Sequence, residues 1–342
     1  MRHGLKVLST CSALVVMSLW ATALGAQTQT ARIVRNANAF LSTLDPAQRQ
    51  RVVFAHDDEA QRKRWSNLPT GFVKRAGVTL GELTESQRAA ALTLLSSALS
   101  ARGYEKVQQI VAADEVLKTS ERNNPMFGKD LYYFSILGTP SETAPWMLQF
   151  GGHHLALNIT VIGAQGVLTP SLTGAQPATY SVNGKTIRPL GQENDKAFAL
   201  INALDPTQRG EAILKYRVSD LVLGPGQDGK VIQPEGLKVS SMNAQQGAML
   251  LDLIGEWTGI VHESAAASRM AEIKSGLDAT WFAWSGPTTV EPGRNGASYY
   301  RIQGPNLVIE YAPQRMGGDP GNHIHTIYRD PTNDYGRKPS GK

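Results

Sequence analysis

A six-residue string that occurs twice constrains the fold of this chain more than any other feature. Residues 44–49 read LDPAQR and residues 204–209 read LDPTQR, so five of the six positions are identical. The string has the form of a helix start. Aspartate caps the first free backbone amides, proline suits the first helical position, and glutamine three residues after the cap can bond back to the cap amide. Two such starts raise the possibility of an internal duplication, but alone they could be a coincidence between two good caps.

A second pair of helix starts follows the first pair at nearly the same distance. Thr84-Glu-Ser-Gln begins one stretch with apolar residues at helical spacing, and Asn243-Ala-Gln-Gln begins another. Thr84 lies 39 residues after Asp45, and Asn243 lies 38 residues after Asp205. The matched spacing strengthens the case for two copies of one unit.

Strand-like segments follow the helices in both halves. The run YYFSILGTPS at 132–141 resembles WFAWSGPTT at 281–289, and each is aromatic and ends in a turn signal. The next segments, WMLQFGGHHLALNI at 146–159 and YYRIQGPNLVIEY at 299–311, align loosely. Residues 163–190 are rich in Gly, Pro, Ser and Thr, which predicts loops and short strands between the halves.

These correspondences predict an α+β fold that is internally duplicated. Each copy is expected to have helices followed by antiparallel strands, and the strands of both copies to pack into a shared sheet system. We place the first copy at 27–190 and the second at 191–342, as parts of one compact globular unit. Two unrelated α+β halves are the alternative that the residues leave open.

The N-terminus has the three parts of a signal peptide. A basic head with Arg2 and Lys6 precedes a mostly apolar run, and small residues follow at Gly25 and Ala26. We therefore expect residues 1–26 to be removed and the protein to be periplasmic or secreted in a bacterium. No membrane span is expected after cleavage.

Removal of this segment changes two properties of the chain. The only cysteine leaves with it, so the mature protein would have no disulfide, which suits a bacterial periplasm for a core of this size. The formal net charge falls from +5 by two, because Arg2 and Lys6 leave without any acidic residue. There is no run of five like charges, so no nucleic-acid partner is expected.

Two motif-like strings carry little weight. GPGQDG at 224–229 matches a dinucleotide fingerprint, but the KVIQPEGLKV that follows lacks the helical pattern that the motif needs, so a hairpin or compact loop is predicted. His262-Glu-Ser could suggest a hydrolytic group, although a lone His-Glu step of this kind is usually a surface feature.

Two short histidine motifs are the candidate site. His323 and His325 lie in GNHIHTIYRDPTND at 321–334, and in an extended strand they would project from one face. Two imidazoles at that spacing can share a metal ion at about 2.0–2.1 Å, as in zinc sites. His153 and His154 precede a strand pattern, which places them on opposite faces, His153 on the apolar face and His154 on the polar one.

The duplication sharpens this hypothesis. Pro305 and Asn306 stand in the second half where the first half has its histidine pair, so a single asymmetric site between the copies is expected. The predicted metal ligands are His153, His154, His323 and His325, and residues expected to bind the metal or to orient those imidazoles are Glu310, Asp330, Asp334 and Arg329.

Three functions remain open for these histidines. They could bind a divalent transition metal such as zinc or copper, in an enzyme with a small-molecule substrate and a carboxylate base. They could instead form a buried hydrogen-bond network in a structural envelope protein. The third possibility is a metal-free ligand pocket. Composition and spacing do not decide whether the chain is an enzyme.

A second cluster occupies residues 56–83. Arg64 beside Trp65 is a candidate for lining a cleft that takes an anion or a sugar. The alternative is structural, because Asp58 and Arg62 have the spacing of an ion pair on a helix.

Four strings of the chain occur in the same order in a known bacterial family. They are the segment from His56 to Leu83, YYFSILGTPS, GGHHLALN and NHIHTIYRDPTNDYG. The chain therefore resembles the domain-of-unknown-function family numbered 3500 over most of residues 36–336. The resemblance implies that both histidine motifs belong to one shared architecture. It implies no particular activity, because none is established for the family.

Overall fold

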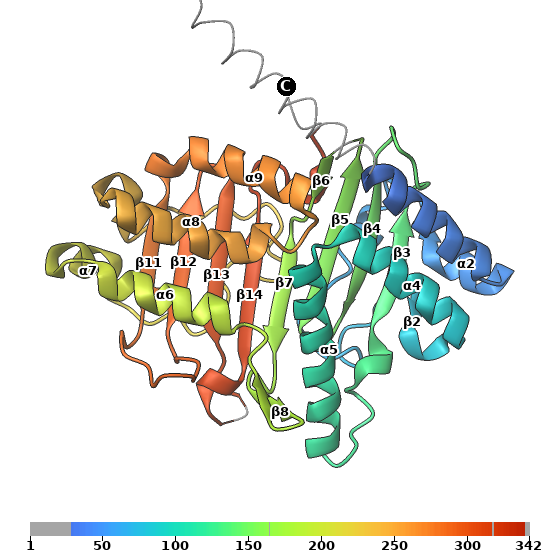
Figure 1. The fold of residues 1–342 in the computed structure, drawn as a ribbon, viewed down its shortest axis with the longest axis horizontal. Coiled ribbons are helices and arrows are strands. Elements are labelled where there is room, and N and C mark those ends of the chain that lie inside the picture. The colour runs from blue at the N-terminus through green and yellow to red at the C-terminus, as the bar shows by residue number, and fades with distance from the viewer. Residues whose placement is uncertain (1–28, 164, 317, 339–342) are drawn as a thin grey trace, which may run out of the picture.

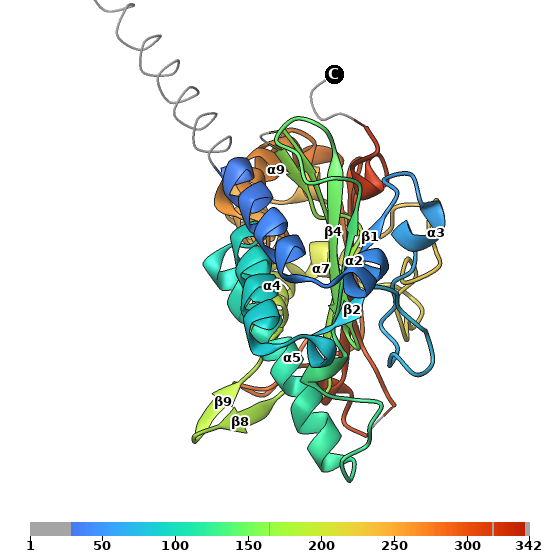
Figure 2. The same ribbon diagram turned by 90° about the vertical axis from the view of Figure 1, so that its right-hand side faces the viewer.

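The protein is built on one large mixed sheet. The computed structural model describes residues 29–338 except 164 and 317, so the predicted signal peptide at 1–26 lies outside the described residues. The longer helices pack against one face of the sheet, and long loops that include a short helix at Glu59–Arg62 cover the other (Figures 1 and 2). The predicted α+β class is confirmed.

The first half contains helices before its main strands. A helix over 29–43 comes first. The further helices are α2 (Pro46–Val52), α3 (Glu59–Arg62), α4 (Glu85–Ala98) and α5 (Ala101–Ser120), with 3-10 turns at Leu80–Glu82 and Lys129–Leu131. The strands are β1 (Val53–Phe54), β2 (Val78–Thr79), β3 (Tyr133–Leu137), β4 (Trp146–Gly152), β5 (Leu155–Ile162), β6 (Gln165–Val167) and β7 (Ser171–Ala175).

The second half follows a separate hairpin, β8 (Tyr180–Val182) and β9 (Lys185–Ile187). Its helices are α6 (Gly191–Ala203), α7 (Pro206–Ala212), α8 (Ala244–Thr258) and α9 (Glu263–Ser275), with 3-10 turns at Val239–Ser241, Leu277–Ala279, Pro320–Asn322 and Asp334–Gly336. Its strands are β10 (Leu237–Lys238), β11 (Trp281–Ser285), β12 (Tyr299–Gly304), β13 (Leu307–Pro313) and β14 (Ile324–Arg329).

The repeated helix starts form as predicted. Asp45 accepts from the amide of Gln48 while the Gln48 side chain accepts from the Asp45 amide, and Asp205 and Gln208 do the same in the second half. The glutamine of the next helix start then bonds to the first glutamine in each half, because the side-chain Nε2 of Gln246 donates to Gln208 Oε1 at 2.8 Å. The bond of Gln87 to Gln48 in the first half has the same length.

The sheet order divides at its centre. The strands run β1-β3-β4-β5-β7-β14-β13-β12-β11-β10, so each half contributes one side and the β7–β14 pair joins them. Helices, strands and turns follow one another in a similar order in the two halves. That order is what a duplication would produce, and the duplication itself stays a prediction.

The antiparallel β7–β14 pair sits between two apolar clusters. His325 pairs with Gly174 and Thr326 with Thr173, and the two threonine hydroxyls lie 2.7 Å apart. The indole of Trp257 on α8 donates to the Thr326 hydroxyl at 3.0 Å. Thr326 therefore faces the helices, and its neighbour His325 projects from the opposite face, because side chains alternate along a strand.

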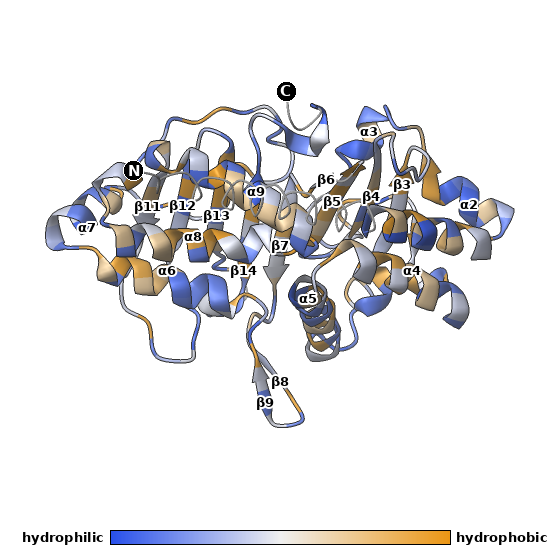
Figure 3. Cartoon of the chain, turned by 45° about the horizontal axis from the view of Figure 1, so that its top comes forward, coloured by the Kyte–Doolittle hydropathy of each residue, from blue (hydrophilic) through white to orange (hydrophobic). Residues whose placement is uncertain are grey.

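Buried apolar side chains form two main clusters, one in each half. One apolar cluster lies mostly in the first half around Phe40, Leu94 and Phe134, and a second lies in the second half around Ile201, Trp257 and Tyr300. Figure 3 shows apolar ribbon in strands such as β5 and hydrophilic ribbon in outer segments such as α7. Within the described part of the chain, no helix is long and apolar enough to cross a membrane.

A loop layer covers the other face of the sheet. We use this name for residues 55–77 and 213–236, one segment from each half (Figure 2). The amides of Val222 and Leu223 donate to the Glu310 carboxylate on β13, and Arg75 donates to the carbonyl of Gly152 on β4. The site described below lies where the two segments meet.

The helices of the two halves also touch, and one contact is tight enough to test. A methyl group added at Gly103 in α5 would lie 2.1 Å from the carbonyl oxygen of Ile260. Gly103→Ala should therefore destabilise the protein by about 1–3 kcal/mol, as overpacking does. The measurement is the midpoint and slope of urea unfolding.

Gly247 provides the matched control. It lies in α8 with nothing within 4 Å of the added methyl group. Gly247→Ala should stabilise the protein by about 0.5–1 kcal/mol, because alanine is the better helix former. Equal effects of the two substitutions would contradict the close packing of α5 against residue 260.

Candidate functional site

His153 and His154 form a tight turn. They are the two residues between Gly152 at the end of β4 and Leu155 at the start of β5, which pair with each other. The prediction that they belong to the strand is wrong, because the hairpin reverses at these residues. The predicted faces are confirmed, since His153 contacts Asp114 on the helical side and His154 contacts His323 on the other side. Their rings stack with centroids 3.7 Å apart, and His154 has a left-handed backbone with φ of 61°.

The turn is fastened to both neighbouring segments. The His154 amide donates to the carbonyl of Asn67 at 3.2 Å, and the amide of Gly174 on β7 donates to the His154 carbonyl at 2.7 Å. Position 174 has no room for a side chain, because a methyl group added to Gly174 would lie 2.7 Å from the carbonyl oxygen of Ile324 and 3.3 Å from the His154 side chain. These bonds hold an uncommon backbone conformation in place.

His323 and His325 enter the site from the start of β14. His323 ends the 3-10 turn at 320–322 with extended backbone, and His325 is the second residue of the strand. Both side chains project toward the loop layer. This agrees with the same-face arrangement expected from their spacing.

Three of the four predicted histidines converge. His154 Nε2 lies 3.0 Å from His323 Nε2, and His323 Nε2 lies 3.2 Å from His325 Nε2. Each of the three side chains offers one nitrogen within 4.8 Å of the other two. Nitrogen ligands of tetrahedral zinc at 2.0–2.1 Å are separated by about 3.3 Å. The two short separations therefore match those of metal ligands.

The hydrogen bond at Nδ1 of His323 determines which ring nitrogen carries the proton. His323 Nδ1 lies 2.8 Å from the Met316 carbonyl oxygen, which can only accept, so the neutral ring carries its proton on Nδ1. Nε2 then has one lone pair, yet it faces the Nε2 atoms of both His154 and His325. One lone pair cannot satisfy two donors at full strength, and without a donor the facing lone pairs repel. A cation at the centre would satisfy all three nitrogens.

Burial keeps these rings neutral. His154, His323 and His325 are 2%, 8% and 5% exposed. Burial, followed by the neighbouring imidazoles, holds the pKa of His154 well below its usual value. Burial and then His325 lower the pKa of His323 to about 4. Burial also lowers the pKa of His325, although Asp220 opposes the shift. Neutral imidazole is the form that binds a metal ion.

Two residues of the loop layer complete the site, and the sequence did not suggest either. Asp220 Oδ1 lies 3.5 Å from His325 Nδ1, and the Asn67 amide nitrogen lies 3.3 Å from the same atom. The Asp220 side chain is 57% exposed. Burial alone would raise its pKa, but the hydrogen bonds with His325 and the Leu221 amide outweigh this and lower it. Asp220 is therefore an ionised group at the solvent side of the site.

His153 lies outside the convergent set. Its Nδ1 contacts Asp114 Oδ1 at 2.6 Å, and Asp114 belongs to α5 on the helical face. Tyr132 donates to the His153 carbonyl at 2.9 Å. His153 thus anchors the turn to the helical layer, while its stacked neighbour His154 faces the cluster.

The other predicted ligands have different partners. Glu310 accepts from two loop amides and from the Tyr299 hydroxyl at 2.5 Å, and burial raises its pKa. Arg329 donates to the carbonyls of Leu223 and Gly224. These side chains hold the loop layer on the sheet instead of approaching the histidines.

The two predicted aspartates after β14 are likewise occupied. Asp334 pairs with Arg329 and accepts from the Asp330 amide, and Asp330 accepts from Thr332 and pairs with Arg269 on α9. The DPTND segment is thus a turn held by its own side chains. Its turn-forming residues explain this better than metal binding does.

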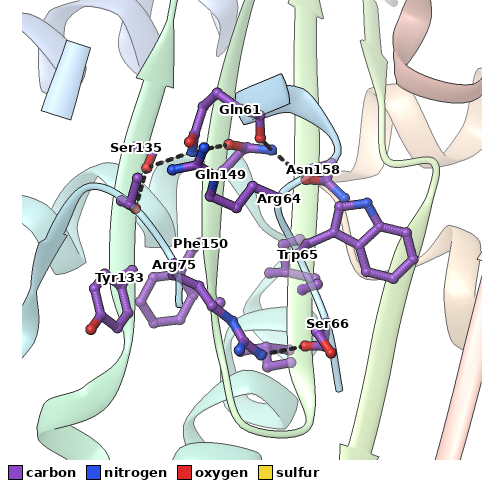
Figure 4. A pocket seen from close by; sticks show the side chains of 15 residues that line it. Gln61, Arg64, Trp65, Ser66, Arg75, Tyr133, Ser135, Gln149, Phe150 and Asn158 are labelled. Atoms are coloured by element: carbon purple, nitrogen blue, oxygen red, sulfur yellow. Dashed lines mark hydrogen bonds between the residues drawn. The ribbon is translucent and has the colours of Figure 1, made fainter. Parts of the chain in front are cut away.

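Arg64 and Trp65 border a small polar cavity instead of a broad cleft. Figure 4 shows it between the loop layer and strands β3 to β5. Gln61 donates to Gln149 at 3.0 Å, and Gln149 donates to Asn158 at 2.9 Å. The cavity has about 30 Å³, which holds a water molecule but no sugar or larger ligand.

The GPGQDG string and the His262-Glu-Ser string both have structural roles. Residues 224–229 form turns in the loop layer with no helix after them, as predicted. His262 caps α9, since its Nδ1 accepts from the Ser264 amide at 3.2 Å, and it is buried, so the prediction of a surface position is wrong.

Comparison with known proteins adds a family but no activity. A family model described as "Protein of unknown function (DUF3500)" matches residues 26–337, which is nearly the whole chain. Neither the curated proteins nor the solved structures contain a match. The geometry of the site is therefore the basis for its function.

The lowered histidine pKa values predict a pH dependence of the metal-free protein. In the unfolded chain these histidines take up protons near 6.5, whereas His323 does so only near 4 when folded. The unfolded state thus binds more protons, and the free energy of unfolding should decrease as the pH falls from 6.5 toward 4. Urea unfolding of chelator-treated protein at several pH values measures this. His323→Gln should flatten the dependence, and an unchanged slope would contradict it.

Proposed function

Because this chain belongs to the DUF3500 family, whose description names no activity, we propose its function from the histidine site itself. The proposal is an exported protein with one transition-metal site, formed by His154, His323 and His325, that acts as a metal-dependent enzyme on a small molecule. A structural protein with a metal-free histidine network is the alternative.

The position of His323 supports the metal most directly. Its Nδ1 proton is committed to the Met316 carbonyl, while its Nε2 lies 3.0 and 3.2 Å from two further Nε2 atoms. In a metal-free network, either one of these two N···N contacts has no proton between its nitrogens, or two N–H groups compete for the single lone pair on His323 Nε2. A divalent ion bound by three imidazoles takes one lone pair from each of them. The tautomer of His323, with its proton on Nδ1, leaves the Nε2 lone pair available for this.

The ligand set favours a catalytic site over a purely structural one. Structural zinc sites have four protein ligands, whereas catalytic sites have three and leave one position for water or substrate. Three histidines converge here, and the described part of the chain places no fourth histidine, cysteine, aspartate or glutamate with them in one metal-sized group. Imidazole ligands suit zinc, copper, iron or nickel.

Asp220 takes the role that we expected of Glu310, Asp330 or Asp334. Its Oδ1 accepts from the Leu221 amide at 2.7 Å and from Gln314 at 2.9 Å, which fixes the carboxylate beside His325. A bound metal ion would polarise a substrate or lower the pKa of a water molecule. Asp220, ionised and half-exposed, would accept the proton that such a water gives up, and Asn67 would orient the reacting group.

Elemental analysis tests the metal site. Untagged protein should carry close to one transition-metal ion per chain. His323→Ala and His325→Gln should each abolish this content, because two imidazoles bind far more weakly than three. The same samples should lose the stabilisation that added Zn²⁺ gives the wild type in thermal unfolding, since a ligand that binds only the native state raises its stability.

His56→Ala is the matched control, because it removes a loop-layer imidazole that lies outside the cluster. It should keep the metal content of the wild type. Full metal content in folded His323→Ala would refute the site. Folded wild type that binds no Zn²⁺, Cu²⁺, Ni²⁺ or Co²⁺ would instead favour the metal-free network.

Asp220→Asn tests whether the carboxylate beside His325 acts on the metal site. It keeps the shape of the side chain but removes the charge beside His325. Loss of such an orienting partner typically weakens metal affinity by about 10–100-fold, which competition with a chelating dye can measure. Asp252→Asn, an exposed aspartate on α8, is the control and should leave the affinity unchanged. Equal affinities of both variants would show that Asp220 does not act on the metal site.

A further inference from the structure

Two arginines of the second half stand apart from the others. Of the nine described arginines from Arg188 onward, seven donate to a carboxylate or a carbonyl, whereas Arg217 and Arg315 make no ion pair or hydrogen bond with the described residues. Both are exposed, and both line one hollow together with Ser219 and Tyr299. Two like charges are thus held beside each other without a protein anion between them.

The hollow adjoins the histidine site along the chain. Ser219 immediately precedes Asp220, whose carboxylate lies 3.5 Å from His325. Arg315 immediately precedes Met316, whose carbonyl holds His323. Both arginines therefore sit one to three residues from groups that contact the cluster.

The sheet register gives the separation. Pro313, which lines the hollow, pairs with Ile324, which lies between His323 and His325 in the chain. Tyr299 lies on β12, one strand beyond the strand of Pro313. Neighbouring strands are about 4.8 Å apart, so the hollow is on the order of 10 Å from the cluster. A small molecule can span that distance.

We propose that Arg217 and Arg315 form a subsite for an anionic group, such as a phosphate, sulfate or carboxylate, of the molecule that reacts at the metal. This inference rests on the proposed metal site and names the substrate class for it. Guanidinium groups bind oxyanions through paired, charge-assisted hydrogen bonds, and the Ser219 hydroxyl adds a donor at the hollow.

The local charges agree with this role. Three acidic groups that adjoin the lining residues are already engaged. Glu235, which accepts from Tyr216, pairs with Arg301, and Asp319 pairs with Arg294. Glu310 accepts from two amides and from Tyr299. Asp220, which follows Ser219 in the chain, is likewise engaged by Leu221, Gln314 and His325. No acidic residue lines the hollow itself, so an anion there would meet two arginines that have no carboxylate partner among the described residues.

Calorimetric titration with inorganic phosphate, sulfate and acetate is the first experiment. The variant Arg217→Gln/Arg315→Gln is compared with Arg35→Gln/Arg122→Gln, which removes the same charge from two exposed arginines away from the hollow. At least one anion should bind the wild type and the control alike. The loss in the hollow variant should be about tenfold or more, as expected for charge-assisted bonds. Equal affinities in both variants, or no binding of any probe to the wild type, would overturn the subsite.

The second experiment asks whether the anion lies beside the metal. The ³¹P relaxation of inorganic phosphate is measured with the protein loaded with Co²⁺. Faster relaxation in the wild type that disappears in Arg217→Gln/Arg315→Gln supports the subsite. Faster relaxation that survives in this variant would mean that phosphate binds the metal without the arginines, which overturns it.

Failure of the metal site is distinguishable from failure of the subsite. If the wild type binds no Co²⁺, the proposed function fails, and the calorimetric comparison still decides whether the arginines bind an anion. If the hollow variant keeps its metal content but loses phosphate, both proposals are supported. The arginines lie outside the ligand set, so that content should not change.

Discussion

The hydrogen-bonded pairing of β7 with β14 is the constraint on which the rest of the structure depends. It is the point at which the two sides of the sheet meet, and its register places His325 opposite Gly174. The absence of a side chain at Gly174 lets the turn that carries His154 approach the same strand. A shift by one residue would turn His325 toward the helices and separate it from His154. Fold and site are therefore fixed by the same ladder of backbone bonds.

Local chemistry explains what the sequence could predict. The helix starts at Asp45 and Asp205 depend on residues within four positions, so their capping could be predicted without tertiary information. The same holds for the spacing of His323 and His325. The turn at His153 and His154 and the close approach of His154 to His323 could not be predicted in this way, because they depend on where the hairpin reverses and on bonds to Asn67 and Gly174.

The carboxylate at the site was beyond the sequence for a related reason. Asp330 and Asp334 are close to the histidines in the chain, yet their turn uses their oxygens for its own amides and for arginines. Asp220 is about a hundred positions away from His325, in a loop with no periodic pattern. It reaches the site because the backbone amides of Val222 and Leu223 donate to the Glu310 carboxylate on β13. These two bonds hold this part of the loop against the sheet. Nothing in the spacing of charges signals such an arrangement.

The distribution of the three imidazoles along the chain has a consequence for the order of events during folding. One is at 154 and the others are at 323 and 325, so a nascent or truncated polypeptide that stops before residue 323 holds a single imidazole of the set. Capture of an ion would then coincide with closure of the central ladder and would not precede it. Only the completely folded chain would then bind the ion tightly, and an incompletely folded chain, with one imidazole of the set, would bind it weakly.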